Sequence, residues 1–288
     1  MIATVYLLLA ALTLGAPLPH VPLAPHAATL RIAVVGDTGE GSDRVANGIA
    51  KLHARTPLDA VIITGDAFYP CGPSSAADPQ WNRVRALSRI GVPLFPVLGN
   101  HDFCGKSQPS AQIGATAVPH WQFPARQYVI DSNLAELLML DTTPYANARN
   151  DDAADALRQT FAAKKTTPWR IAAGHHPILS SGYHGHFPRD QHLRMVTLDP
   201  LMRHAKVDLY ICGHDHHLEL IDAQPRLLIS GAGSDPVPPL VPHKKTIYPS
   251  EATRQLGFAT VELDALSMTI RFFDGDGNAI SKPFVFKR

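Results

Sequence analysis

From residue 30 onward, short apolar runs alternate along the chain with longer stretches of helical character. Five of the apolar runs end in a glycine followed by Asp, Asn or His, and they occupy residues 30–35, 60–64, 94–98, 171–173 and 209–212. The stretches between them predict helices over residues 42–54, 79–90, 152–163 and 189–204. Strands that alternate with helices in this way are typical of an α/β fold.

The last quarter of the chain has a different pattern, in which strands follow one another directly. Residues 227–230, 258–263, 268–273 and 283–286 are predicted strands, and 274–277 form a turn. The Pro-rich residues 235–249 are predicted to be a loop insertion within the domain, not a domain linker. A length of 288 residues is compatible with one large α/β domain.

Composition excludes two broad classes. The chain has 26 Lys and Arg against 25 Asp and Glu, without a long run of one sign, which argues against a nucleic-acid partner. Hydrophobic residues make up 45% and charged residues 18%, so the chain can bury a core and is not disordered.

The N-terminus resembles a secretory signal. Residues 1–16 are apolar but shorter than the roughly 20 residues that a membrane-spanning helix needs, and a Pro-rich stretch follows. Small residues offer cleavage sites at Ala16 and at Ala27–Ala28. We therefore expect a leader over 1–28, a folded domain over 29–288, export to the periplasm or medium, and no stable membrane insertion after cleavage. Because no Lys or Arg precedes Arg31, an uncleaved membrane tether is the alternative.

Three cysteines fit an exported protein with one disulfide. Cys71 and Cys104 each lie two residues beyond a candidate ligand segment, whereas Cys212 lies in an apolar run that is predicted to be a core strand. We pair Cys71 with Cys104, and three free thiols are the alternative.

The turns that follow the five runs concentrate oxygen and imidazole donors. Nine of the 15 histidines lie between residues 175 and 217. The absence of thiolates from this set argues against a structural zinc site and favours a hydrolytic centre. Seven donors exceed what one ion requires, so two ions that share a carboxylate are expected.

The order of these motifs resembles the calcineurin-like metallophosphoesterase superfamily. Tyr69, three positions after Asp66, resembles the tyrosinate ligand of purple acid phosphatases, and the small, tartrate-resistant type fits best. The resemblance implies a four-layer α/β/β/α sandwich of two mixed sheets, with the active site at the carboxyl ends of strands. The motifs are Asp37-Thr38-Gly39, Gly65-Asp66-Ala67-Phe68-Tyr69, Gly99-Asn100-His101-Asp102, Gly174-His175-His176 and Gly213-His214-Asp215-His216, supported by Ala111-Gln112-Ile113 and Leu228-Ile229-Ser230-Gly231-Ala232-Gly233.

The resemblance also implies two metal ions per chain. One is Fe(III), held by Asp37, Tyr69 and His216, because a hard trivalent ion favours carboxylate and phenolate oxygens. The other is a divalent ion (Fe, Zn or Mn), with Asp66 bridging the two. The divalent ion would be held by Asn100, His175 and His214.

The implied catalytic residues are His101, His184 and Asp102. The two histidines would hold phosphate and protonate the departing oxygen, while Asp102 would orient the ring of His101. The domain would then be an acid phosphatase that hydrolyses small phosphate monoesters with a metal-bound hydroxide. The resemblance leaves the oligomeric state open.

Two alternatives accompany this hypothesis. A phosphodiesterase or nucleotide pyrophosphatase can be built on the same scaffold, and a catalytically silent metal-binding protein can retain the fold. Complete retention of the ligand positions and of His101 and His184 favours an enzyme. The small, tartrate-resistant members of the family carry a long exposed loop before the strand that leads to Gly174-His175, and its cleavage raises their activity. Here residues 145–151 form only a short turn, so this departure from the family predicts that no lid covers the metals and that activity needs no proteolytic step.

Overall fold

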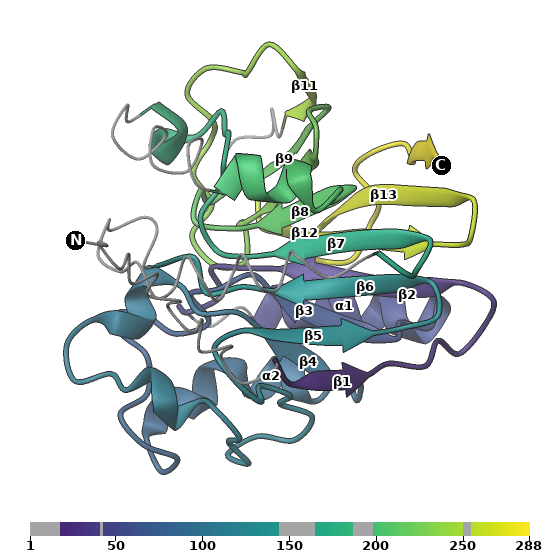
Figure 1. The fold of residues 1–288 in the computed structure, drawn as a ribbon. Helices are drawn as coiled ribbons and strands as arrows, with labels where there is room; N and C mark the ends of the chain where they lie inside the picture. The colour runs from purple at the N-terminus through teal and green to yellow at the C-terminus, as the bar shows by residue number, and fades with distance from the viewer. Residues whose placement is uncertain (1–17, 41–42, 144–164, 187–197, 250–254) are drawn as a thin grey trace, which may run out of the picture.

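Two mixed β-sheets form the centre of the protein, as the computed structural model shows for residues 18–40, 43–143, 165–186, 198–249 and 255–288 (Figure 1). The larger sheet has the order β1 (His20–Pro22), β5 (Tyr128–Asp131), β6 (Ala135–Met139), β7 (Trp169–Ala173), β8 (Leu209–Cys212), β10 (Arg226–Ser230), β9 (Leu218–Ile221) and β11 (Thr246–Pro249). The smaller sheet has the order β14 (Phe284–Lys287), β13 (Ser267–Asp274), β12 (Gly257–Leu263), β2 (Leu30–Val35), β3 (Ala60–Ile63) and β4 (Leu94–Pro96).

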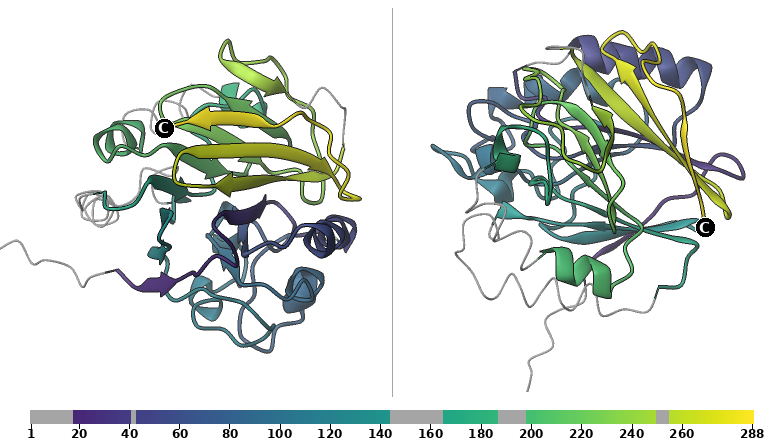
Figure 2. Two further views of the ribbon diagram at one scale, coloured as in Figure 1. Left: turned by 90° about the vertical axis from the view of Figure 1, so that its right-hand side faces the viewer. Right: turned by 90° about the horizontal axis from the view of Figure 1, so that it is seen from above.

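The central strands are buried on both faces, because one face packs against the other sheet and the opposite face packs against helices. Along β6, Leu137 and Met139 pack into the core between the sheets, whereas Leu138 packs into a second core with Leu198 and Met202. This division follows from the two-residue period of a strand. Helix α1 (Asp43–Arg55) covers the smaller sheet and the helical residues 198–204 cover the larger one (Figure 2). The predicted α/β fold of two mixed sheets is confirmed.

The helices agree with the predictions only in part. Helix α1 matches the predicted 42–54, but 79–90 forms the 3₁₀ helix η1 (Pro79–Val84) and the short α2 (Arg85–Ser88) instead of one α-helix. Three further 3₁₀ helices are η2 (Asn100–Phe103), η3 (Pro109–Ala111) and η4 (Tyr183–His186). The predicted helix over 152–163, the segment 145–151 and the first part of the predicted helix 189–204 lie outside the described residues.

All nine predicted strands are present, with ends shifted by up to two residues, and the sheets contain further strands that were not predicted. Strands β5 and β6 pair antiparallel, and β9 pairs with β10 and β11. The prediction of a loop over 235–249 is wrong for its last four residues, because Thr246–Pro249 form β11 at the edge of the larger sheet. A terminal proline is tolerated there because an edge strand leaves one row of backbone groups unpaired.

Part of the predicted leader belongs to the sheet. Strand β1 pairs in parallel with β5, with His20 opposite Val129, and Leu23 is buried. The backbone N–H of His26 donates to the carboxylate of Asp59 over 2.7 Å. Among the described residues, none of the helices combines the length and apolar character required to cross a bilayer.

Candidate active site

The ends of five strands bring the predicted ligands together. Asp37, Asp66, Asn100, His175 and His214 follow β2, β3, β4, β7 and β8, all of which run parallel to a neighbour within their sheet. Three of these residues adopt the left-handed backbone conformation, with φ of 56° at Asp37, 49° at Asp66 and 68° at His214. Such residues are uncommon outside functional sites, where the turn aims a side chain at one point.

One group of donors surrounds the Tyr69 hydroxyl. This oxygen lies 3.2 Å from Asp37 Oδ1 and 3.1 Å from His216 Nε2. His216 Nε2 is in turn 3.4 Å from Asp37 Oδ1. Three potential ligand atoms therefore face one another in a triangle, which is the set predicted for the ferric ion.

A second group surrounds His175 Nε2. This nitrogen lies 3.0 Å from Asn100 Oδ1 and 3.1 Å from His214 Nδ1. It is the set predicted for the divalent ion.

Asp66 joins the two groups through one oxygen. Its Oδ2 lies 3.2 Å from His175 Nε2 in the second group and 3.5 Å from the Tyr69 hydroxyl in the first. Its Oδ1 accepts a hydrogen bond from the backbone N–H of His101 over 3.0 Å, which fixes the carboxylate plane. The side chain of Asp66 thus contacts both donor groups, as a carboxylate shared between two ions would.

Backbone carbonyls orient two of the imidazoles. His175 Nδ1 lies 2.8 Å from the carbonyl oxygen of Thr64, and His216 Nδ1 lies 2.8 Å from that of Asp235. A carbonyl oxygen only accepts, so Nδ1 of each ring carries a proton, and Nε2 is the nitrogen that faces the site and can bind a cation once it is deprotonated. Outer partners of this kind are usual for metal-binding histidines.

The site concentrates negative charge in a buried place. Burial lowers the pKa of His175, but the charges of Asp66 and Asp37 raise it to a net value of about 9. Burial likewise lowers the pKa of His216, and Asp37 raises it to about 9. Without a cation, both imidazoles are therefore protonated and balance the carboxylates. Their Nδ1 atoms contact backbone carbonyls, so it is the Nε2 atoms that face the donor groups.

A cation fits this donor set better than protons do. One potential ligand atom from each of Asp66, His175 and His214 lies within 4.8 Å of the other two. A proton can bridge only one pair of these atoms, whereas a metal ion can bind all three. Burial and then the charges of Asp37 and Asp66 raise the pKa of Tyr69, so its phenolate form requires a nearby positive charge.

Two glycines allow these residues to approach. A Cβ on Gly99 would lie 2.1 Å from Asp66 Oδ1, and a Cβ on Gly65 would lie 2.4 Å from His175 Nδ1. Gly65 also has a φ of +91°, which other residues rarely adopt. The glycines before the ligands are therefore required for space as well as for the turn.

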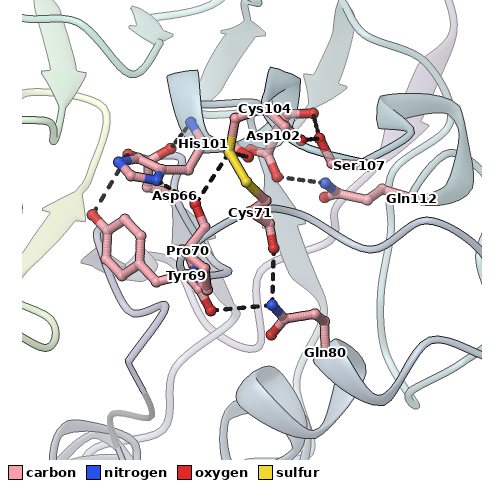
Figure 3. The surroundings of a disulfide bond; sticks show 10 residues. All are labelled: Asp66, Tyr69, Pro70, Cys71, Gln80, His101, Asp102, Cys104, Ser107 and Gln112. Carbon is pink, nitrogen blue, oxygen red and sulfur yellow. Dashed lines mark hydrogen bonds and ion pairs between the residues drawn. A yellow bond between two sulfur atoms is a disulfide. The ribbon is translucent and has the colours of Figure 1, made fainter.

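His101 lies beside the first donor group and close to the disulfide (Figure 3). Its ring packs edge-on against Tyr69, with 4.5 Å between ring centroids, and its Nε2 is 3.9 Å from Asp66 Oδ2. A disulfide joins Cys71 to Cys104 and thereby links the loop that carries Tyr69 to the turn that carries His101. Cys212 is buried and takes part in no disulfide, as predicted.

The role predicted for Asp102 is not the one that the structure shows. Its carboxylate accepts from the backbone N–H of Gly99 over 2.8 Å and from Gln112 Nε2 over 2.6 Å, so it points into the protein and stabilises its own 3₁₀ turn. The carbonyl oxygen of Pro70 lies 2.6 Å from His101 Nδ1 and orients that ring instead. Burial and the charge of Asp66 raise the pKa of Asp102 to about 7.

His184 lies on the opposite side, beside the second donor group. Its ring is 3.8 Å from that of His214 between centroids, and its backbone N–H donates to Asp215 Oδ1 over 2.9 Å. His101 and His184 therefore flank the two donor groups from different elements, η2 and η4.

The sequence did not identify two supporting residues. The hydroxyl of Thr142 accepts from the backbone N–H groups of His175 and His176, both over 3.2 Å. Glu219, fully buried on β9, accepts from Ser181 N over 2.9 Å and lies 3.0 Å from His217 Nε2. A threonine after a short strand and a glutamate within one have no distinctive pattern, so neither could have been found from the sequence.

The fold and this arrangement of donors define a metal-dependent phosphoesterase. A family model described as calcineurin-like phosphoesterase matches residues 30–218, and the chain belongs to this family. The chain is accordingly a hydrolase of phosphoric esters, and its similarity within the family is to purple acid phosphatases of the small, tartrate-resistant type.

Two curated relatives are named as phosphatases, and one solved structure has a similar fold. The mouse protein named tartrate-resistant acid phosphatase type 5 is 28% identical, over 96% of this chain and 97% of its own. Purple acid phosphatase 3 of Arabidopsis thaliana is 26% identical, over 88% of this chain and 76% of its own. The structure titled GAP50, the anchor in the inner membrane complex of Plasmodium, is 25% identical and has a TM-score of 0.74, covering 90% of this chain and 88% of its own.

Proposed function

We propose that the protein is an acid phosphatase that hydrolyses phosphate monoesters at a centre of Fe(III) and a divalent ion. The observation that carries this proposal is the pair of donor groups that meet at Asp66 Oδ2. Relatives named purple acid phosphatases support a centre of two metals. Fe, Zn and Mn are the candidates for the divalent ion.

Donor chemistry assigns the ions. Asp37, Tyr69 and His216 would hold Fe(III), because this group contains a carboxylate and the only phenol, which are oxygen donors that a hard trivalent ion favours. The other group has an amide oxygen and two imidazoles, which are neutral donors suited to a divalent ion. It consists of Asn100, His175 and His214.

When bound, the two ions supply positive charge for the phosphoryl oxygens and acidify bound water. The protein supplies the proton transfers. His101 donates its Nδ1 proton in a hydrogen bond to the Pro70 carbonyl, so its Nε2 is the atom that can exchange a proton with an ester oxygen. His184, from the side of His214, would hold another phosphate oxygen.

The experiment that tests this proposal combines metal analysis with a visible spectrum of the purified protein. We expect two metals per chain and a charge-transfer band from phenolate to Fe(III) that disappears in Tyr69→Phe. An iron-loaded protein that stays colourless would contradict the assignment of Tyr69. Turnover is measured on para-nitrophenyl phosphate and on bis(para-nitrophenyl) phosphate, since preference for the diester would identify a phosphodiesterase. A fully loaded protein that hydrolyses neither compound would be a metal-binding protein without catalysis.

We further propose that the protein is exported, with a cleaved leader within residues 1–28. The apolar run over 1–16 supports this, and a disulfide between Cys71 and Cys104 fits an oxidising compartment. N-terminal sequencing of protein recovered from outside the cytoplasm tests it. An intact N-terminus on membrane-bound protein would indicate the tether instead.

A further inference from the structure

Arg83, on η1, lies where two hollows of the surface meet. The site hollow, about 440 Å³, is lined by Tyr69, His101 and His216 of the active site, and by Glu40, Asp235 and Arg83. The side hollow, about 590 Å³, is lined by Arg83 and Lys106, together with Cys71 and neighbouring polar residues. Arg83 is thus shared between the space over the active site and an adjoining space.

The charges are distributed unevenly around these hollows. Arg83 is the only lysine or arginine among the described residues that line the site hollow, and two carboxylates, Glu40 and Asp235, line it as well. In the side hollow, Lys106 adds a second positive charge. Its one carboxylate, Asp78, already accepts from Ser74 N over 2.8 Å and from Gln80 N over 2.9 Å. The lysine and arginine charges that line the two hollows are therefore on the side of Arg83 and Lys106, and a second anionic group is favoured there.

Arg83 is not used elsewhere in the described part of the chain. It forms no ion pair or side-chain hydrogen bond there, unlike its neighbour Arg85, whose Nε donates to Asn82 Oδ1 over 3.1 Å. Its backbone is held by the buried side chains of Trp81 and Val84 on η1. A half-buried guanidinium with free donors, on a supported segment, is suited to binding carboxylate or phosphate through two hydrogen bonds.

We propose that Arg83, assisted by Lys106, forms a subsite for a second anionic group of the substrate. The inference rests on the proposed function, because the first phosphate must lie at the donor groups around Asp66. The preferred substrates would be small phosphate esters whose leaving group carries another phosphate or carboxylate. Arg83 is then a specificity-determining residue and has no part in breaking the ester bond.

The test compares two substrates that differ by one phosphate, fructose 1,6-bisphosphate and fructose 6-phosphate. We expect the wild type to prefer the bisphosphate in kcat/KM, and Arg83→Ala to lower that preference about tenfold, as loss of a hydrogen-bonded charge does. Turnover of fructose 6-phosphate and of para-nitrophenyl phosphate should stay within about twofold. Arg89→Ala is the matched control, since this exposed arginine follows α2 and lines neither hollow.

Three results would overturn the inference: no preference for the bisphosphate in the wild type, an equal loss on both substrates in Arg83→Ala, or the same loss in Arg89→Ala. A wild type that hydrolyses neither para-nitrophenyl phosphate nor the two sugar phosphates would refute the proposed function, not the subsite. The two sugar phosphates then remain intact, and isothermal titration calorimetry compares their dissociation constants. If Arg83→Ala reduces the ratio of the two dissociation constants about tenfold, the subsite is supported in the absence of hydrolysis as well. An unchanged ratio overturns it.

Discussion

Replacement of Glu219 should destabilise the protein more than any surface substitution, because four donors converge on this one buried carboxylate. They are Ser181 N and Oγ, Thr246 Oγ1 and His217 Nε2. These residues belong to the segment before η4, to β11 and to the segment before β9. Glu219 therefore connects three segments around the active site.

The magnitude follows from which donors can find another partner. In Glu219→Ala, the hydroxyls of Ser181 and Thr246 can rotate, but the backbone N–H of Ser181 and the ring of His217 stay buried and unpaired. Each of these two unpaired donors costs about 1–3 kcal/mol, so the free energy of unfolding should fall by about 2–6 kcal/mol. Glu219→Gln keeps the shape and loses the charge, and should cost about 1–3 kcal/mol.

Urea denaturation of the metal-free protein at pH 7, followed by tryptophan fluorescence, measures these differences. The control is Glu262→Ala, which removes an ion pair with Arg31 from a side chain that is 41% exposed and should cost at most about 1 kcal/mol. Equal losses for the two alanine variants would refute the reasoning.

The pH dependence provides a second check. Burial alone would raise the pKa of Glu219. The hydrogen bonds from His217, Ser181 and Thr246 together have the larger effect, so the pKa lies below that of an ordinary glutamate. A carboxylate with a lowered folded-state pKa stabilises the protein above its unfolded pKa and loses this contribution as the pH falls through the folded value. The difference between wild type and Glu219→Gln should therefore shrink once the pH falls below the ordinary glutamate pKa of about 4.3.

Three further predictions concern the active site. His101→Ala and His184→Ala should retain both metals and lose turnover by roughly 10²–10⁴-fold, and metal loss in either would reassign that histidine as a ligand. Asp66→Ala should lose both ions whereas Asn100→Ala should lose mainly one, as metal analysis will show, and equal losses would contradict a shared ligand. Gly99→Ala should bind metal as poorly as Asp66→Ala, because its Cβ would lie 2.1 Å from Asp66 Oδ1, and normal metal content would refute this steric argument.

The sequence pattern predicted the α/β class and the convergence of donors at strand ends, because both depend on side-chain type. The two-sheet sandwich and the division of the donors into two groups came from the resemblance to a known family. Apolar runs that end in glycine and a metal-binding residue place Asp37, Asp66 and His175 at strand ends, and parallel strands bring such ends together. No long-range contact had to be known for this inference. The same pattern indicated which glycines precede the ligands.

What the sequence did not predict depends on the backbone or on tertiary contacts. The carbonyls of Pro70 and Asp235 orient His101 and His216, and a carbonyl group has no signature in the sequence. The inward turn of Asp102 depends on a hydrogen bond from Gln112, ten positions away. Strands β5, β6, β9 and β11 lack the flanking glycine that marked the five runs before the ligands.

The placement of the donors on different sheets has a consequence for assembly. Asp37, Tyr69 and Asn100 follow strands of the smaller sheet, whereas His175 and His214 follow strands of the larger one. Each proposed ion would thus cross-link the two halves of the sandwich and would be captured only after both sheets have packed. Each tenfold rise in free metal above the dissociation constant should then add about 1.4 kcal/mol to the stability of the folded state. At low metal concentration, both the stability of the packed sheets and the rate of ester hydrolysis would therefore fall.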